Sequence, residues 1–231
     1  MKNKHILIVA AHPDDEVLGC GATIARHHHE GDTVHVVILA EGATSRDERR
    51  EPDKRNSELK ALSAAADRAR AILGASSLEL HDFPDNRMDA VNLLDVIKVI
   101  EGALDRFQPE IVYTHHGGDL NIDHRIVHKA VITACRPVPN APIRTLLFFE
   151  IPSSTEWQAP GSAPSFAPSW FVDVSPWLER KIQALEAYQA EMRPWPHPRS
   201  LEAVTHLARW RGATIGVQAA EAFVLGRHLI K

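Results

Sequence analysis

Short apolar runs alternate with helical patterns along this chain, and that alternation restricts the fold more than any other feature. The apolar runs, most of them rich in Val, Ile and Leu, lie at residues 6–11, 33–40, 78–81, 111–115, 145–151 and 170–174. Helical patterns lie at residues 16–30, 52–73, 90–107, 123–135, 176–192 and 200–211. Strands that alternate with helices form a parallel sheet joined by right-handed crossovers. We therefore predict an α/β fold, a mostly parallel sheet with helices on both faces.

The length and composition favour one globular domain that spans residues 1–231, with 44% hydrophobic and 24% charged residues. After residue 151 the composition changes to a Pro- and Ser-rich stretch, PSSTEWQAPGSAPSFAPS. It is too long and too aromatic for a simple turn, so we expect a functional or interface loop. The C-terminal portion, from about residue 152, should be rich in loops. We assign no element to the apolar segment that follows residue 211.

Charge and cysteine content restrict the function and the location. A net charge of −4 argues against a general nucleic-acid binder and favours small-molecule partners. Cys20 and Cys135 lie in apolar helical stretches, which predicts two buried thiols in a reducing compartment. The first apolar run stops after six residues, too few for a signal-peptide core or a membrane span. We expect a cytoplasmic protein.

An acidic cluster follows the first predicted strand, where His12, Asp14, Asp15 and Glu16 stand close together. A loop from a parallel strand into a helix usually presents backbone N–H groups to an anion, and three carboxylates would repel one. A divalent cation reverses this preference, because it favours imidazole and carboxylate around it. The cluster therefore predicts a metal site.

A second cluster follows the predicted strand at 111–115 and contains Asp119, Asn121, Asp123 and His124. Ligands of such sheets gather at the carboxyl ends of the strands, so both clusters should meet there.

Two imidazoles and one carboxylate, from His12, His124 and Asp15, form the three-ligand set typical of a catalytic zinc with room for water. Asp14 is free to take a proton from that water, which predicts hydrolysis. We expect Asp119 and Asp123 to support the ligands.

Two other classes of protein fit parts of this pattern. A non-haem Fe(II) oxygenase uses two His and one carboxylate, but it normally needs no second acid as a base. A non-catalytic nucleotide-binding domain would use Gly19 and Gly21 as a glycine-rich loop. These glycines follow the acids and lack the full fingerprint, so the hydrolase is favoured.

The stretches AAHPDDEVLGCG and THHGGDLNIDHR together resemble the PIG-L/LmbE-like family of zinc-dependent N-acetylglucosamine deacetylases. The resemblance implies a Rossmann-like fold with its active site at the carboxyl ends of the strands. It implies that His12, Asp15 and His124 hold Zn²⁺ and that Asp14 is the general base. The implied reaction removes the acetyl group from an N-acetylated amino sugar, similar to N-acetylglucosamine, or from its conjugate.

The sequence departs from the family at Asn121, where many relatives carry a His that stabilises the tetrahedral intermediate or protonates the leaving amine. Asn121 can donate a hydrogen bond but has no proton to transfer. His197, on a proline-rich loop, is our candidate proton donor, with His116 as the second candidate. The resemblance also suggests a homo-oligomer and contacts from Asp85 and Asn86 to sugar hydroxyls. Arg46 could bind a substituent of the sugar.

Overall fold

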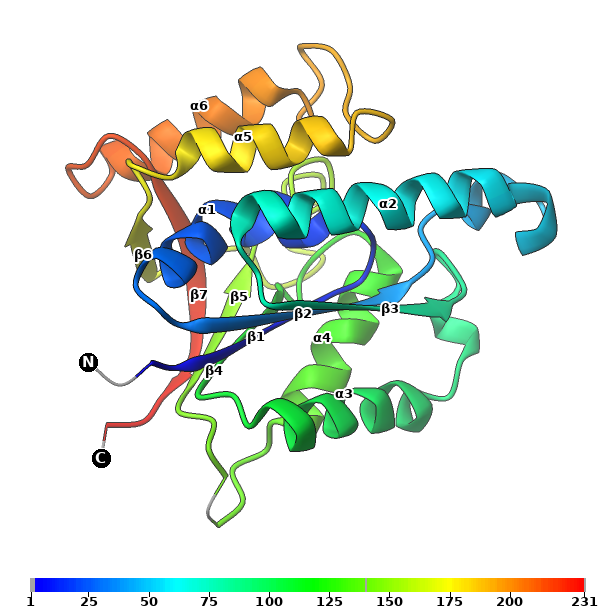
Figure 1. The fold of residues 1–231 in the computed structure, drawn as a ribbon, viewed down its shortest axis with the longest axis horizontal. Helices are drawn as coiled ribbons and strands as arrows, with labels where there is room; N and C mark the ends of the chain where they lie inside the picture. Colours follow the sequence, from blue (N-terminus) through cyan, green and yellow to red (C-terminus); the bar gives the residue numbers. More distant parts are fainter. Residues whose placement is uncertain (1–2, 140, 231) are drawn as a thin grey trace.

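A seven-stranded sheet with strand order β3-β2-β1-β4-β5-β7-β6 forms the centre of the molecule (Figure 1). The computed structural model describes residues 3–139 and 141–230. The strands are β1 (His5–Ala10), β2 (Thr33–Ala40), β3 (Ser77–Phe83), β4 (Ile111–His115), β5 (Thr145–Phe149), β6 (Trp170–Asp173) and β7 (Ala220–His228). The α-helices are α1 (Asp15–His29), α2 (Asn56–Leu73), α3 (Leu93–Phe107), α4 (Ile122–Ala134), α5 (Leu178–Ala187) and α6 (Leu201–Ala213).

Strands β1 to β5 are parallel, which confirms the predicted α/β class. The apolar segment that the sequence left unassigned is β7, and it runs antiparallel between β5 and β6. Gly226 in β7 lies so close to Phe148 of β5 that a Cβ atom would be 2.7 Å from its ring. The glycine therefore lets the two backbones pair at this point, near a register shift in the β5–β7 ladder.

Both faces of the sheet are covered, which explains the unbroken apolar runs of its central strands. In β1 the side chains of Ile6 and Ile8 join the core beneath α1, α2 and α5, and those of Leu7 and Val9 join the core beneath α3 and α4. Figure 1 shows α1, α2, α5 and α6 over one face and α3 and α4 over the other.

Several predicted boundaries move by a few residues. The predicted helix at 52–73 begins as a 3₁₀ turn (Pro52–Arg55), and α2 proper (Asn56–Leu73) is then terminated by Gly74, whose φ is 78°. Helix α5 ends at Ala187, earlier than predicted, because the chain turns toward a proline-rich loop. The stretch at 152–169 contains no helix or strand, as predicted.

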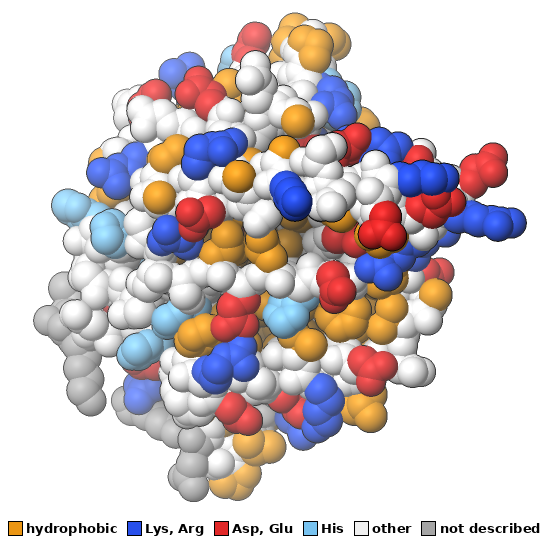
Figure 2. Space-filling model, turned by 45° about the vertical axis from the view of Figure 1, so that its right-hand side comes forward, with side chains coloured by type: hydrophobic (Ala, Val, Ile, Leu, Met, Phe, Trp, Pro, Cys, Tyr) orange, Lys and Arg blue, Asp and Glu red, His pale blue; other side chains and the backbone are white. Residues whose placement is uncertain are grey.

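Acidic and basic side chains are interspersed over the face of the molecule that Figure 2 shows. Cys20 and Cys135 are buried and free, in agreement with the prediction. Among the described residues, none of the helices combines the length and the apolar character that a membrane crossing requires.

Helix α1 is broken at Cys20, where φ is −151° and ψ is 25°. The break frees backbone groups on both of its sides in the interior. The Lys181 ammonium of α5 donates a hydrogen bond of 2.8 Å to the carbonyl oxygen of Leu18. It also lies 2.6 Å from Glu221 of β7.

Glu221 completes this arrangement by accepting hydrogen bonds from the backbone N–H groups of Ala22, at 3.1 Å, and Thr23, at 2.7 Å. Both charged side chains are about 5% exposed or less. The buried pair therefore joins α1, α5 and β7 and satisfies the polar groups that the break exposes.

Replacing Glu221 by Ala should lower the free energy of unfolding by about 3–5 kcal/mol, because it leaves Lys181 as a buried unpaired charge. Urea denaturation measures the change. Glu30→Ala is the matched control, since Glu30 forms an exposed ion pair with Arg26 and its loss should cost less than about 1 kcal/mol. Equal effects of the two substitutions would contradict the role of the buried pair.

Candidate functional site

The two predicted clusters meet at the carboxyl edge of the sheet, because β1 and β4 are adjacent and parallel. The chain leaves β1 through His12 and enters α1 at Asp15. It leaves β4 after His115 and enters α4 just before His124. Side chains separated by more than a hundred residues in the sequence therefore face one another.

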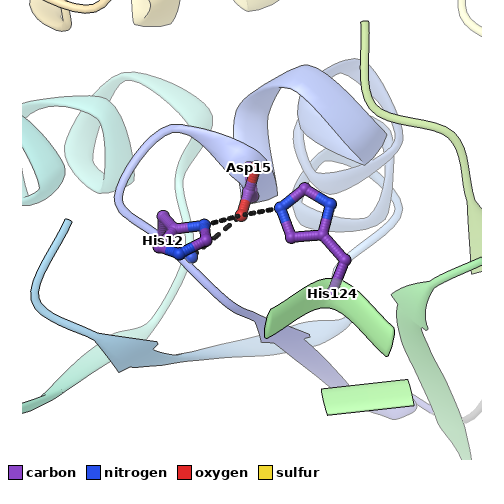
Figure 3. Close-up of side chains that lie close together, drawn as sticks. All are labelled: His12, Asp15 and His124. Carbon is purple, nitrogen blue, oxygen red and sulfur yellow. Dashed lines mark hydrogen bonds and ion pairs between the residues drawn. The ribbon is translucent and has the colours of Figure 1, made fainter. Parts of the chain in front are cut away.

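His12, Asp15 and His124 converge on one point (Figure 3). Asp15 Oδ2 lies 3.2 Å from Nδ1 of His12 and 3.2 Å from Nε2 of His124. One ligand atom from each residue lies within 4.8 Å of the other two, a spacing that a metal ion could bridge. His12 is 8% exposed and the other two side chains are fully buried.

The second nitrogen of each imidazole faces another carboxylate. Nε2 of His12 lies 3.0 Å from Asp123 and 3.3 Å from Asp85, and Nδ1 of His124 lies 3.1 Å from Asp119. A carboxylate in this position fixes the ring orientation and keeps the proton on the nitrogen that faces away from a metal. Asp119 and Asp123 therefore lie where a carboxylate can orient the imidazoles of His124 and His12.

The electrostatics of this cluster favour a cation. Burial alone would lower the pKa of His124, but Asp15 and Asp119 outweigh it and raise that pKa to about 9. Burial would raise the pKa of Asp15, yet the charges of His124 and His115 hold it well below its usual range. Among the described residues, Asp15 Oδ1 and His124 Nε2 are buried without a hydrogen-bond partner. This donor set, with atoms to spare, fits a divalent ion that displaces the imidazole protons.

Asp14 lies beside the cluster in an unusual backbone conformation. Its φ of 113° is rare for a residue with a side chain. Its carboxylate does not cap α1; instead Oδ2 accepts a hydrogen bond of 2.8 Å from the Arg199 guanidinium, and Oδ1 is buried and unpartnered among the described residues. Burial raises the pKa of Asp14 well above its usual range, and the charge of Arg199 opposes that rise.

Glu16, the third acid of the first cluster, forms hydrogen bonds with neighbouring parts of the protein. It accepts a hydrogen bond of 2.7 Å from the hydroxyl of Tyr188, after α5, and one of 3.1 Å from the backbone N–H of Asp14. Burial raises the pKa of Glu16 to about 7. Asp14, Asp15 and Glu16 therefore each have different hydrogen-bond or ion-pair partners.

The loop at 152–169 supports the site from the side of α4. The hydroxyls of Ser154 and Thr155 donate hydrogen bonds to the carboxylate of Asp119, that of Thr155 at 2.6 Å. His116 Nε2 donates to the carbonyl oxygen of Pro164 at 2.9 Å. Gly118 lies against the same segment, where a Cβ atom would be 1.9 Å from that oxygen. The predicted functional loop is thereby attached to the second cluster.

Asn121 caps α4. Its Oδ1 accepts hydrogen bonds from the backbone N–H groups of Asp123, at 2.8 Å, and His124, at 3.4 Å. Its Nδ2 donates to Asn86 Oδ1 at 2.9 Å. Both the oxygen and the nitrogen of the Asn121 side-chain amide therefore form hydrogen bonds within the protein.

The three residues predicted to contact the substrate have different partners in the structure. Asp85 is buried against His12 and accepts hydrogen bonds from the backbone N–H of Ser45, at 3.1 Å, and from Asn86 Nδ2, at 2.8 Å. Asn86 bridges Asp85 and Asn121. Arg46 forms an ion pair of 2.8 Å with Glu191 at the end of the α5 region.

His197 lies in the loop at 193–200, on the same loop as Arg199. Its Nδ1 accepts a hydrogen bond of 3.1 Å from the backbone N–H of Arg199. Its ring stands edge-on to Trp157, with centroids 5.7 Å apart. The residue of this loop that contacts the acidic cluster directly is Arg199.

Sequence reasoning missed two residues of the site. Arg199 gave no signal apart from its place beside His197 in a proline-rich loop. His115 lies within the apolar run of β4; its ring stacks on His124, with centroids 4.0 Å apart, and its Nε2 accepts the N–H of Ala11 at 2.8 Å. The sequence indicates His115 only through its position, as a polar residue at the end of a buried strand.

Comparison with known proteins places this chain in a family. Residues 7–135 match the family model described as PIG-L: GlcNAc-PI de-N-acetylase. The uncharacterized deacetylase YaiS of Escherichia coli is 32% identical, over 82% of this chain and 92% of that protein. The 4-oxalmesaconate hydratase of Pseudomonas putida KT2440 is 27% identical, over 98% of this chain and 88% of that protein.

A crystal structure shows the same fold. The N,N'-diacetylchitobiose deacetylase from Pyrococcus horikoshii has a TM-score of 0.76 and 19% identity, covering 97% of this chain and 84% of that chain. The predicted resemblance is therefore confirmed, and the chain belongs to the PIG-L family.

Proposed function

We propose that this protein is a zinc-dependent hydrolase that removes an N-acetyl group from an N-acetylated amino sugar or its conjugate. The observation that carries the proposal is the convergence of His12, Asp15 and His124 beside the free carboxylate oxygen of Asp14. The family description names a de-N-acetylase, and YaiS is named a deacetylase, which supports removal of an acetyl group.

His12, Asp15 and His124 would hold the metal. Zinc bound there would polarise the amide carbonyl and lower the pKa of a water molecule at its open position. Asp14 takes the proton of the attacking water through Oδ1, because Oδ2 is bound to Arg199. Asp119 and Asp123 keep the two imidazoles in place.

The departing amine must receive a proton, because an unprotonated amine leaves slowly. We assign the donation to His197: its Nδ1 accepts an N–H, so the neutral ring carries its proton on Nε2. His116 is the second candidate, although its Nε2 is bound to the loop at 152–169. Asn121 is proposed only as a hydrogen-bond donor to the developing oxyanion, which would require its bond to Asn86 to break.

A hydratase is the second candidate function, because the Pseudomonas putida relative aligns with nearly the whole chain. The same site would then activate water for addition to a carbon–carbon double bond. The glycine-rich nucleotide loop is wrong: Gly19 and Gly21 lie buried inside α1, where a Cβ on Gly19 would be 2.5 Å from the Phe149 ring.

One set of measurements separates the candidates. Metal analysis of the purified protein identifies zinc, iron or no metal. Zinc-loaded protein is then tested for acetate release from a panel of N-acetylated sugars, including free, nucleotide-linked, thiol-linked and lipid-linked forms, and for hydration of unsaturated dicarboxylic acids. Zinc with acetate release supports the deacetylase. Zinc with hydration selects the hydratase, and iron with oxygen uptake selects an oxygenase.

Three further assignments remain proposals. Asp85 lies against His12 and Asn86 against Asn121, and we propose that Asp85 and Asn86 reach sugar hydroxyls of the substrate. We also propose that Arg46 exchanges its ion pair with Glu191 for an anionic substituent of the substrate. The homo-oligomer expected from the resemblance can be measured by light scattering. The cytoplasmic location is consistent with two free buried thiols and is tested by fractionation.

His12→Ala, Asp15→Ala and His124→Ala should each lose most of the bound zinc, because a three-ligand site that lacks one ligand holds the ion poorly. Metal content after dialysis measures the loss. His206→Ala is the control, since this residue lies on α6 with its ring against Trp195. Full zinc occupancy in any of the three variants would refute the ligand assignment.

Asp14→Asn should retain zinc while turnover falls by about 10²-fold to 10⁴-fold, the usual contribution of a positioned base. Steady-state kinetics and metal content are measured on the same preparation. Asp67→Asn, on the exposed face of α2, serves as the control. Loss of the metal from Asp14→Asn would make Asp14 a ligand instead of a base.

His197→Ala should retain zinc, lower kcat by at least about tenfold and remove the alkaline limb of the pH–rate profile, which reports the essential acid. Asn121→His in this background should partly restore activity. Because Asn121 also caps α4, the restored variant needs a check of its thermal stability. Wild-type turnover with an unchanged pH profile would direct attention to His116.

A further inference from the structure

Arg199 connects two parts of the site that the sequence places far apart. Its Nη1 donates a hydrogen bond of 2.8 Å to Asp14 Oδ2, and its Nε donates one of 2.8 Å to the hydroxyl of Ser153. The side chain of Arg199 is 23% exposed, whereas that of Asp14 is 2% exposed. Such a charge-assisted pair, largely removed from water, holds both groups in a defined orientation.

The orientation of Asp14 depends on this contact. As the residue before α1, Asp14 could cap the helix, but its side chain makes no capping hydrogen bond. Of its two carboxylate oxygens, Oδ2 is bound to Arg199 and Oδ1 is buried without a partner among the described residues. Arg199 thereby decides which oxygen remains available to accept a proton.

The other end of Arg199 is fixed by the turn that begins at Ser153. Ser153 has a φ of 70°, and the next two residues, Ser154 and Thr155, donate their hydroxyl hydrogen bonds to Asp119. Asp119 in turn lies 3.1 Å from the ring of His124. One turn therefore connects the arginine that holds Asp14 to the carboxylate behind His124.

We propose that Arg199 is the positioning residue for Asp14: it engages Oδ2 and presents Oδ1 toward the point where His12, Asp15 and His124 converge. Through Ser153 it also keeps a constant spacing between Asp14 and His124. This inference rests on the proposed roles of Asp14 and the metal ligands, but it requires no particular substrate. Arg199 acts through Asp14, so its contribution should vanish when the Asp14 carboxylate that it binds is removed.

A double-mutant cycle on the zinc-loaded protein tests this coupling. Acetohydroxamic acid is the probe, because a hydroxamic acid gives up its proton when it binds a metal ion, and a neighbouring carboxylate that accepts this proton favours binding. Its affinity is measured by calorimetry for wild type, Arg199→Ala, Asp14→Asn and the double variant. Arg199→Ala should weaken binding by at least about tenfold with unchanged zinc content. The double variant should bind no more weakly than Asp14→Asn alone.

Two further variants sharpen the result. Millimolar guanidinium should partly restore probe binding to Arg199→Ala but not to the double variant, because it can refill the vacated position only where the Asp14 carboxylate is there to accept its hydrogen bond. Arg199→Lys should recover only part of the affinity, since an ammonium group cannot contact both Asp14 and Ser153 in the same fork geometry. Arg193→Ala is the matched control, because Arg193 lies on the same loop and, among the described residues, its guanidinium donates to the backbone carbonyls of Ala190 and Met192.

Additive effects of the two substitutions on probe affinity would overturn the proposal, and so would unchanged probe binding in Arg199→Ala. Loss of zinc from Arg199→Ala would also overturn it, because that loss would indicate a general structural role. It is equally overturned if zinc-loaded wild type does not bind the probe. A coupled cycle in a protein that releases acetate from no N-acetylated sugar would support Arg199 while refuting the proposed deacetylase.

Discussion

Buried negative charge at the carboxyl edge of the sheet is the constraint on which the rest of the site depends. Asp14, Asp15, Asp119 and Asp123 are all at most 1% exposed, and isolated carboxylates in such surroundings would be strongly unfavourable. The protein compensates with two imidazoles, one guanidinium and a set of backbone and hydroxyl donors. Each acid has its own partners, yet together the carboxylates raise the pKa of His12 and of His124 above the usual range, against the opposing effect of burial. A divalent cation is the group that this excess of negative charge would attract most strongly.

The segments that complete the site come from the C-terminal part of the chain. The loop at 152–169 supports Asp119, the loop at 193–200 contributes Arg199, and Tyr188 holds Glu16. Helix α5, which leads into Tyr188 and the loop at 193–200, is joined by Lys181 to the break in α1 and to Glu221 of β7. The break lies within the same helix that begins with Asp15, so the stability of this buried pair and the geometry of the ligands are linked.

Deacetylases and a hydratase both occur among the relatives, so the fold does not by itself decide the reaction. Activation of water next to a carboxylate base serves both chemistries. The choice between an amide and a carbon–carbon double bond must depend on the groups around the water. In this chain Arg199 contacts Asp14, and the segment at 152–169 contacts Asp119; both belong to loops outside the sheet. Loops of this kind can change while the strand ends stay constant.

The sequence alone determined the sheet and the main cluster. The apolar runs specify β1, β2, β4 and β5 because most of their side chains are buried on both faces. His12, Asp15 and His124 converge because parallel strands end at one edge. Local patterns could not determine the antiparallel direction of β7, the cap that engages Asn121, or the contact between Arg199 and Asp14. Arg199 and Asp14 are 185 residues apart. Only the packed tertiary structure decides such contacts, because they depend on how loops distant in the sequence pack against the sheet. No periodicity in the sequence encodes that packing.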